Sequence, residues 1–310
     1  MQKILLFIAS LFYFNSLFAK NEIKSWQGIH ETPLSRLEQQ FAEPPVEFAN
    51  HVIWGWEGKM DKKTICNDLD SIKKKGFRAV IFEAGYKLPF KYLSEEWFKA
   101  IRTGVLEAKK RGMKVWIIDE GKYPSGFAGG KFSQERPDLR MQALVIGDTI
   151  QIKRGEVMTN HKIAPEIISA VAVSTSGAPN RTVAINNGEI SFNAGLDDWK
   201  VLLVKSDFRT AVTRAVNNPN GGKDATNSLC DYLNPIAVQQ FIDWTHEQYK
   251  KYLGKELGTT VLGFRGDEPD YAHLPWTPSI VQTFKETKGY DPTPYLASFL
   301  PLRPPYRNKG

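Results

Sequence analysis

The chain of 310 residues contains only two cysteines, Cys66 and Cys230, and they lack the close spacing of a metal-binding motif. They could form one disulfide or remain two buried thiols, and the sequence does not choose between these states. The chain also lacks a His-Glu-x-x-His motif, a Walker loop, a dinucleotide-binding glycine fingerprint and a Gly-x-Ser-x-Gly elbow. These absences argue against nucleotide-dependent enzymes and against serine hydrolases.

Long hydrophobic runs are also missing, apart from one at the N-terminus. Residues 1–19 begin with the positive charge of Lys3, continue with the apolar stretch Ile4–Phe14, and end in the small-residue cleavage site Ser16–Ala19. This pattern predicts a cleavable signal peptide, because the apolar stretch is too short for a stable membrane span. We therefore expect a periplasmic or secreted protein without a stable membrane anchor.

The excess of positive charge is modest, at a formal +7, and it is scattered along the chain. Two basic runs, Lys73–Lys75 and Lys109–Arg111, stand at the ends of expected helices, where cations complement the helix dipole. No aromatic residues interleave with these charges in the manner of a nucleic-acid-binding surface. We therefore expect no nucleic-acid partner.

Strand and helix patterns alternate in the first part of the chain, which predicts a parallel α/β sheet with right-handed crossovers. The alternation returns after residue 217, so residues 20–140 and 217–310 are interpreted as two parts of one (β/α)₈ TIM-barrel fold. The expected strands are 51–56, 76–82, 112–118 and 259–264, and the expected helices are 64–75, 94–111, 234–253 and one that begins at 277.

A different pattern fills residues 141–216, where short strand signals such as Ile167–Val173 and Trp199–Val204 alternate with turns. It predicts a small antiparallel β subdomain inserted in one βα loop. The segment that begins at Leu300 reads as a tail rather than a strand. The barrel is therefore expected to be incomplete at its C-terminus, because too few strands remain to close it.

Carboxylates follow the ends of several expected strands: Glu83, the pair Asp119–Glu120, and the pair Asp267–Glu268. Parallel strands share one rim at their carboxyl ends, so we expect these side chains to meet there. Glycosidic cleavage needs such a group of acids, because one carboxyl protonates the leaving oxygen while another activates water or attacks the sugar. Adjacent acids favour this division, since burial and like charge raise one pKa.

Aromatic and polar side chains accompany the acids, and aromatic rings can either hold sugars or fill a core. Among the histidines, His273 is placed near the site, whereas His246 lies within an expected helix and is interpreted as a surface or packing residue. The predicted catalytic residues are Glu268, Glu120, Asp119 and Asp267, and the predicted substrate-binding residues are Trp54, Trp56, Glu83, Tyr123, Ser125, His273 and Trp276.

Several motifs resemble glycoside hydrolase family 106, the α-L-rhamnosidase-type enzymes, over about residues 40–300. The most specific is Asp119–Glu120 followed by the run Tyr-Pro-Ser-Gly-Phe-Ala-Gly-Gly at Tyr123–Gly130. The other motifs are Phe41–Phe48, Trp54–Trp56, Leu93–Trp97, Asp231–Pro235, Asp267–Pro269 and Leu274–Thr277.

The resemblance implies a (β/α)₈ barrel, an exported enzyme of plant-polysaccharide breakdown, an inverting mechanism with paired carboxylates, and a calcium ion near the substrate. By matching position, it implies a catalytic role for Glu268 and a site role for Asp119 and Glu120. Oligo- or polysaccharide is then the expected binding partner. Calcium would suit carboxylate and carbonyl oxygens, although no calcium-binding loop is readable in the sequence.

Three interpretations stay open at this level. The chain is a secreted glycoside hydrolase, a truncated or inactive carbohydrate-binding relative, or an unrelated exported hydrolase that uses the same acids as metal ligands. Members of the resembled family are much longer, so we expect weak activity or none from this chain alone. Turnover of an aryl rhamnoside separates the first two interpretations, and sensitivity to a chelator bears on the third.

Overall fold

The computed structural model describes residues 33–42, 50–211, 213–215, 223–224, 228–268 and 274–300. The signal peptide expected at residues 1–19 lies outside the described residues. No helix within the described ranges is long and apolar enough to cross a membrane. The chain divides into two compact units, 1–50 and 51–310. The described element of the first is helix α2 (Leu34–Ala42), which has no buried residue.

A four-stranded parallel sheet organises the second unit. Its order is β1 (His51–Trp56), β2 (Ala79–Ala84), β3 (Lys114–Ile118) and β14 (Val261–Arg265), so all the strands point in one direction. β2 is buried along nearly its whole length, which is the condition of a parallel strand covered on both faces. The predicted α/β class is thus present, whereas a closed eight-stranded barrel is absent from the described residues.

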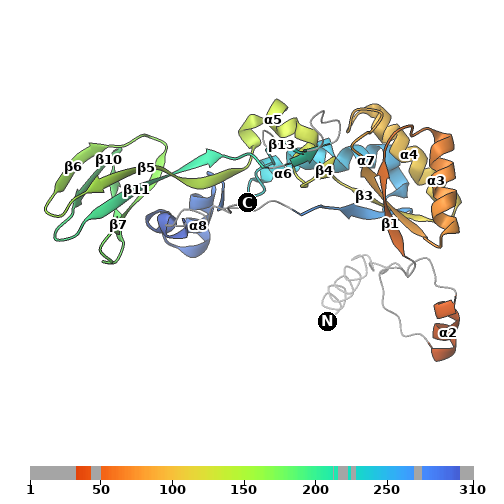
Figure 1. Cartoon of the computed structure of the whole chain (residues 1–310), viewed down its shortest axis with the longest axis horizontal. Coiled ribbons are helices and arrows are strands. Elements are labelled where there is room, and N and C mark those ends of the chain that lie inside the picture. The colour runs from red at the N-terminus through yellow and green to blue at the C-terminus, as the bar shows by residue number, and fades with distance from the viewer. Residues whose placement is uncertain are drawn as a thin grey trace, which may run out of the picture. The chain divides into compact units, whose positions relative to one another are not determined.

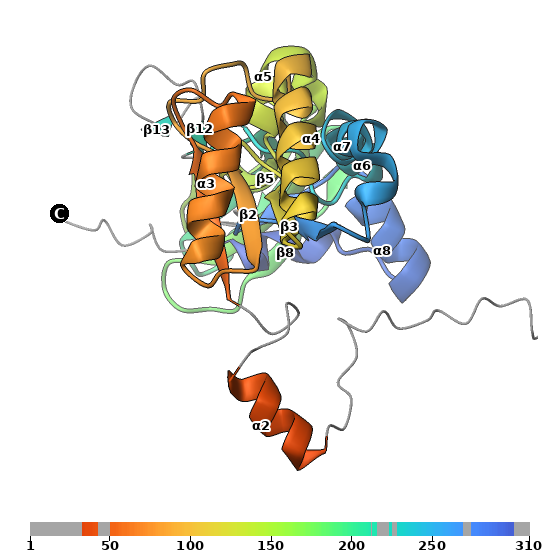
Figure 2. The ribbon, with the colours of Figure 1, turned by 90° about the vertical axis from the view of Figure 1, so that its right-hand side faces the viewer.

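Two helices follow the first two strands and pack side by side against the sheet (Figure 2), namely α3 (Lys62–Lys74) and α4 (Glu95–Lys110). Each begins at a side-chain cap, because Asp61 accepts from the Thr64 N–H at 2.8 Å and Ser94 accepts from the Trp97 N–H at 3.3 Å. The fully buried Trp97 ring of α4 lies 5.8 Å from the Trp56 ring of β1, so aromatic packing fixes this layer.

The prediction of a single helix over residues 234–253 is wrong. The structure has α6 (Pro235–Trp244) and α7 (His246–Leu253), and Thr245 between them departs from helical geometry at φ −117° and ψ −85°. The Thr245 hydroxyl donates to the carbonyl of Phe241 at 2.6 Å, a backbone contact of threonine that bends helices. The bend makes His246 the first residue of a new helix.

The described residues between Gln142 and Asp224 form strands and no helix (Figure 1). An antiparallel five-stranded sheet has the order β15-β5-β11-β7-β8, and β6, β10 and β9 form a second sheet. These strands enclose their own core around Trp199 and Val201. The bounds are β5 (Gln142–Ile152), β6 (Val157–Lys162), β7 (Ile167–Ser174), β8 (Arg181–Val183), β9 (Ile185–Asn186), β10 (Glu189–Asn193), β11 (Trp199–Phe208) and β15 (Pro275–Trp276).

The remaining elements are short, and several surround the loop after β3. Strand β4 (Lys122–Tyr123) of that loop pairs with β12 (Thr213–Ala215), which pairs in turn with β13 (Lys223–Asp224). The others are η1 (Ala128–Gly130), α5 (Lys131–Glu135), η2 (Pro137–Leu139), η3 (Gly254–Glu256), α8 (Ile280–Lys288) and η4 (Thr293–Phe299).

Candidate active site

The loop that follows β3 is organised around the side chain of Glu120, which is completely buried. Its Oε1 accepts from the backbone N–H groups of Gly121 and Gly129 at 2.7 and 2.8 Å. Its Oε2 accepts from those of Phe127 and Ala128 at 3.0 and 2.6 Å. One carboxylate therefore satisfies four backbone donors and ties together the backbone of the turn from residue 121 to residue 129.

Burial raises the pKa of Glu120 to about 8, and the backbone N–H donors of Gly121, Gly129 and Ala128 act in the opposite direction. The sequence led us to expect this acid in a cleft with Glu268, and the structure corrects that expectation. Both of its oxygens point into the loop, and Glu120 does not line the pocket described below. The buried oxygens are committed to the backbone, so Glu120 positions the site and has no exposed oxygen for a substrate.

Ser125, held within this loop, joins the ends of two neighbouring strands. Its hydroxyl donates to Asp119 Oδ1 at 2.7 Å, and its oxygen accepts from the backbone N–H of Asp267 at 2.7 Å. Asp119 directly follows β3, and Asp267 follows β14, the strand that pairs with β3. The predicted convergence of these two strand ends is therefore present, and a serine side chain fixes it.

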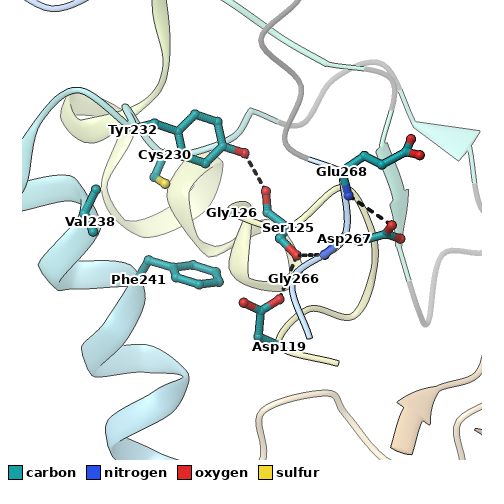
Figure 3. Close-up of a pocket in the computed structure, with 10 residues that line it drawn as sticks. All are labelled: Asp119, Ser125, Gly126, Cys230, Tyr232, Val238, Phe241, Gly266, Asp267 and Glu268. Carbon is teal, nitrogen blue, oxygen red and sulfur yellow. Dashed lines mark hydrogen bonds between the residues drawn. The ribbon is translucent and has the colours of Figure 1, made fainter. Parts of the chain in front are cut away.

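A pocket of about 450 Å³ opens beside this contact (Figure 3). Its acidic part contains Asp119, Asp267 and Glu268, whereas Val238 and Phe241 project into it from α6. The full lining is Asp119, Ser125, Gly126, Cys230, Tyr232, Val238, Phe241, Gly266, Asp267 and Glu268. The pocket thus combines proton-transfer groups with an apolar wall, which is typical of small-ligand sites.

Gly126 allows Tyr232 to close the pocket wall. Gly126 has φ +111°, and a Cβ atom there would lie 2.6 Å from the Tyr232 hydroxyl, which itself donates to the Ser125 carbonyl. Gly126→Ala should therefore lower the free energy of unfolding by about 1–3 kcal/mol through strain and overpacking.

The matched control is Gly155→Ala, where φ is also positive at +79° but nothing lies within 4 Å of the added carbon. Denaturant unfolding of both variants separates backbone strain, which they share, from the clash with Tyr232. Equal losses would show that Tyr232 does not restrict the position.

His246 stands next to the acidic part of the pocket. Its Nε2 lies 3.7 Å from Asp119 Oδ2, and its ring packs edge-on against Phe264 at a centroid distance of 4.4 Å. Burial raises the pKa of the Asp119 carboxyl and lowers that of the His246 imidazole. Both shifts favour uncharged forms, as expected of groups removed from water.

Several predicted substrate-binding residues lie elsewhere. Trp56 is completely buried in the core and Trp276 packs among aliphatic side chains of the β-rich segment, so neither ring can stack on a sugar here. The half-buried Trp54 packs against Trp56 and Phe82. Glu83 and Tyr123 do not line the pocket, and the predicted His273 lies outside the described residues.

Sequence reasoning missed the apolar wall and the histidine. Val238 and Phe241 look like core positions of an amphipathic helix, and the break at Thr245 that directs His246 toward Asp119 leaves no sequence pattern. A signal did exist for Tyr232, which lies within the Asp231–Pro235 motif shared with the resembled family. The sequence also left the state of the two cysteines open. In the structure both are free thiols, and Cys230 lines the pocket.

No cluster of three or more histidine, cysteine or acidic side chains that could hold a metal ion exists among the described residues. The described part of the chain therefore provides no side-chain ligand set for the calcium ion implied by the family resemblance.

Acids at the carboxyl ends of parallel strands, set against an apolar wall, form an arrangement suited to acid–base cleavage of glycosidic bonds. Comparison with known proteins points to the same class. The model of the α-L-rhamnosidase family, glycoside hydrolase family 106, matches residues 161–300. The chain thus resembles that family, as its motifs led us to expect.

Two individual proteins extend the comparison. A curated protein named "Putative beta-glucuronidase", from Formosa agariphila, is 23% identical to this chain. The match spans 97% of this chain and 28% of the Formosa protein. The structure of a rhamnosidase from Novosphingobium sp. PP1Y matches with a TM-score of 0.56 and 12% identity, over 87% of this chain and 43% of the rhamnosidase. The fold is therefore shared, although the chain spans less than half of either protein.

Proposed function

We propose that the chain carries the acid–base site of an exported glycoside hydrolase that cleaves α-L-rhamnosyl or similar bonds in plant-type polysaccharide. The main support is the convergence of Asp119, Asp267 and Glu268 in one pocket at the ends of paired strands. The match of residues 161–300 to the rhamnosidase family supports the sugar class. The signal-peptide pattern at residues 1–19 supports export.

The chemistry of the pocket wall favours a neutral deoxy sugar over a uronic acid. The described lining residues include the acids Asp267 and Glu268 beside the proton donor Asp119, and no lysine or arginine, so the carboxylate of a uronosyl group would meet like charge and no cation. The apolar atoms of Val238 and Phe241 match the methyl group of a 6-deoxy sugar. This argument favours the rhamnosidase activity over that named for the Formosa protein.

In the proposed reaction, Asp119 donates its proton to the leaving glycosidic oxygen as the bond from that oxygen to the anomeric carbon breaks. Water attacks the same carbon and gives its proton to the carboxylate of Glu268, which is exposed to solvent. Bulk water then returns Asp119 and Glu268 to their starting states. The assignment follows burial, because a buried carboxyl keeps its proton more readily than an exposed one.

The direct test measures hydrolysis of aryl α-L-rhamnoside and aryl β-D-glucuronide by the purified chain, and binding of the free sugars by calorimetry. We expect turnover by this chain alone to be weak, and any rhamnoside turnover to be at least tenfold faster than that of the glucuronide, because like charge of about 1.4 kcal/mol or more opposes the acidic sugar. A preference for the glucuronide would overturn the proposed specificity. The absence of both turnover and binding for both sugars would overturn the proposal as a whole.

A second candidate is a carbohydrate-binding relative without turnover. The chain covers 28% of the Formosa protein and 43% of the Novosphingobium rhamnosidase, so the activity of either whole protein is itself a proposal for this chain. Binding of L-rhamnose with no turnover of the aryl rhamnoside would favour this candidate. Repeating the assay after chelation and after addition of calcium tests the metal that the family resemblance implies.

A further inference from the structure

The hydrogen bonds around His246 fix its tautomer. The Thr245 hydroxyl has one proton, which it donates to the Phe241 carbonyl at 2.6 Å. The same Thr245 oxygen lies 3.1 Å from His246 Nδ1 and can only accept from it. Nδ1 therefore carries a proton, and in the neutral ring Nε2 presents a lone pair.

That lone pair faces an acid whose other oxygen is already occupied. Asp119 Oδ1 accepts from the Ser125 hydroxyl, whose oxygen is in turn occupied by the Asp267 N–H. Oδ2 is the oxygen that lies 3.7 Å from His246 Nε2. An imidazole lone pair and an ionised carboxylate oxygen repel each other where both side chains are largely removed from water, so a proton on either one relieves the contact.

We propose that Asp119 and His246 hold one proton between them, and that His246 is a positioning residue for this proton at the pocket wall. The assignment of the proton to glycosidic cleavage rests on the proposed function, whereas the tautomer and the shared proton do not. His246 does not line the pocket, so it acts through Asp119 and not on the sugar.

The surrounding charges are consistent with one shared proton. The charge of Asp267, after β14, raises the pKa of Asp119, and the charge of His246, in α7, lowers it. The charge of Asp119 in turn raises the pKa values of Tyr92, Tyr249 and Glu120. His246 is acted on by Asp119 and by its neighbour Glu247, and its ring also contacts Phe241 of α6 and Phe264 of β14. Every other titratable group in this set is an acid or a phenol, so His246 is the one base among them.

Nitrogen NMR of histidine-labelled chain tests the proposal without any need for activity. His246→Gln identifies the resonances of this ring among the five histidines. We expect the wild-type spectrum at neutral pH to show protonated Nδ1. Asp119→Asn removes the negative partner, so protonation of His246 should move to lower pH in that variant. A wild-type ring protonated at Nε2 alone, or the same titration in Asp119→Asn, would overturn the proposal.

Thr245 offers a matched pair of variants. Thr245→Ser keeps the hydroxyl and should keep the protonated Nδ1, whereas Thr245→Val removes the acceptor and should populate the other tautomer. The same tautomer in both variants would contradict the role given to Thr245. Circular dichroism checks that each variant folds, and any variant that does not fold leaves the wild-type tautomer and the Asp119→Asn titration to decide.

A pH profile of aryl rhamnoside hydrolysis adds a readout that a structural role would not move. Replacement of the imidazole by glutamine offers Asp119 an N–H donor, which favours the carboxylate. The alkaline limb of kcat/KM should therefore shift to lower pH in His246→Gln. A uniform loss of rate at every pH would mean that His246 contributes only packing. A chain without turnover but with the expected NMR result would refute only the proposed function.

Discussion

Glu120→Ala should lower the free energy of unfolding by about 4 kcal/mol or more, the largest stability effect expected of any acid in the site. The truncation leaves three buried N–H donors, those of Gly121, Phe127 and Ala128, without their acceptor, and each costs roughly 1–3 kcal/mol unless water reaches it; the Gly129 N–H is partly exposed and adds less. Urea unfolding followed by tryptophan fluorescence measures the loss.

Glu57→Ala is the matched control for this prediction. Glu57 also accepts from a backbone N–H, that of Tyr86 at 3.1 Å, but it does so once and on the surface. We expect a change within about 0.5 kcal/mol, the usual range for surface substitutions. If the two alanine variants were equally stable, the hydrogen bonds accepted by Glu120 would not stabilise the loop.

The largest effect on activity is expected from the two acids assigned to the reaction. Asp119→Asn and Glu268→Gln should each lower kcat for an aryl rhamnoside by roughly 10²–10⁴-fold, because each removes one proton-transfer group. Both replacements preserve shape, so affinity for L-rhamnose should remain within about a factor of three, or less than 1 kcal/mol.

Glu95→Gln serves as the control, because Glu95 lies on the exposed surface of α4 and pairs there with Lys99. Its kcat should match that of the wild type. Wild-type turnover in both site variants would remove Asp119 and Glu268 from the mechanism. Loss in only one would assign the chemistry to that acid and require a different partner.

The sequence predicts the regular part of the fold well, because periodic burial decides it. The strand at His51–Trp56 has the bounds of β1, and the helix expected from Ser94 to Arg111 is α4 with Ser94 as its cap. The strand ends then identify Asp119 and Asp267 as neighbours, since parallel strands share one rim. The strands observed between Gln142 and Phe208 also fall where short, turn-separated patterns were expected.

What the sequence does not determine is the direction in which each side chain points. Asp119 and Glu120 are adjacent, yet one lines the pocket and the other is enclosed by its own loop. Trp56 stands at a strand end like the acids, but aromatic packing buries it completely. His246 depends on a helix break that a single hydroxyl produces at Thr245. Each outcome follows from local contacts that carry no periodic signal.

The order of the parallel sheet has a consequence for how the molecule assembles. β3 and β14 are neighbours, yet the hydrogen bond from the Asp267 N–H to Ser125, in the loop after β3, joins residues 142 positions apart. Closing a loop of that length in an unstructured chain costs on the order of 4 kcal/mol of entropy. The intervening strands gather around Trp199 in a core of their own, which would shorten the loop before β14 arrives. The pocket is therefore expected to form late in folding, after the segment between its two halves has collapsed.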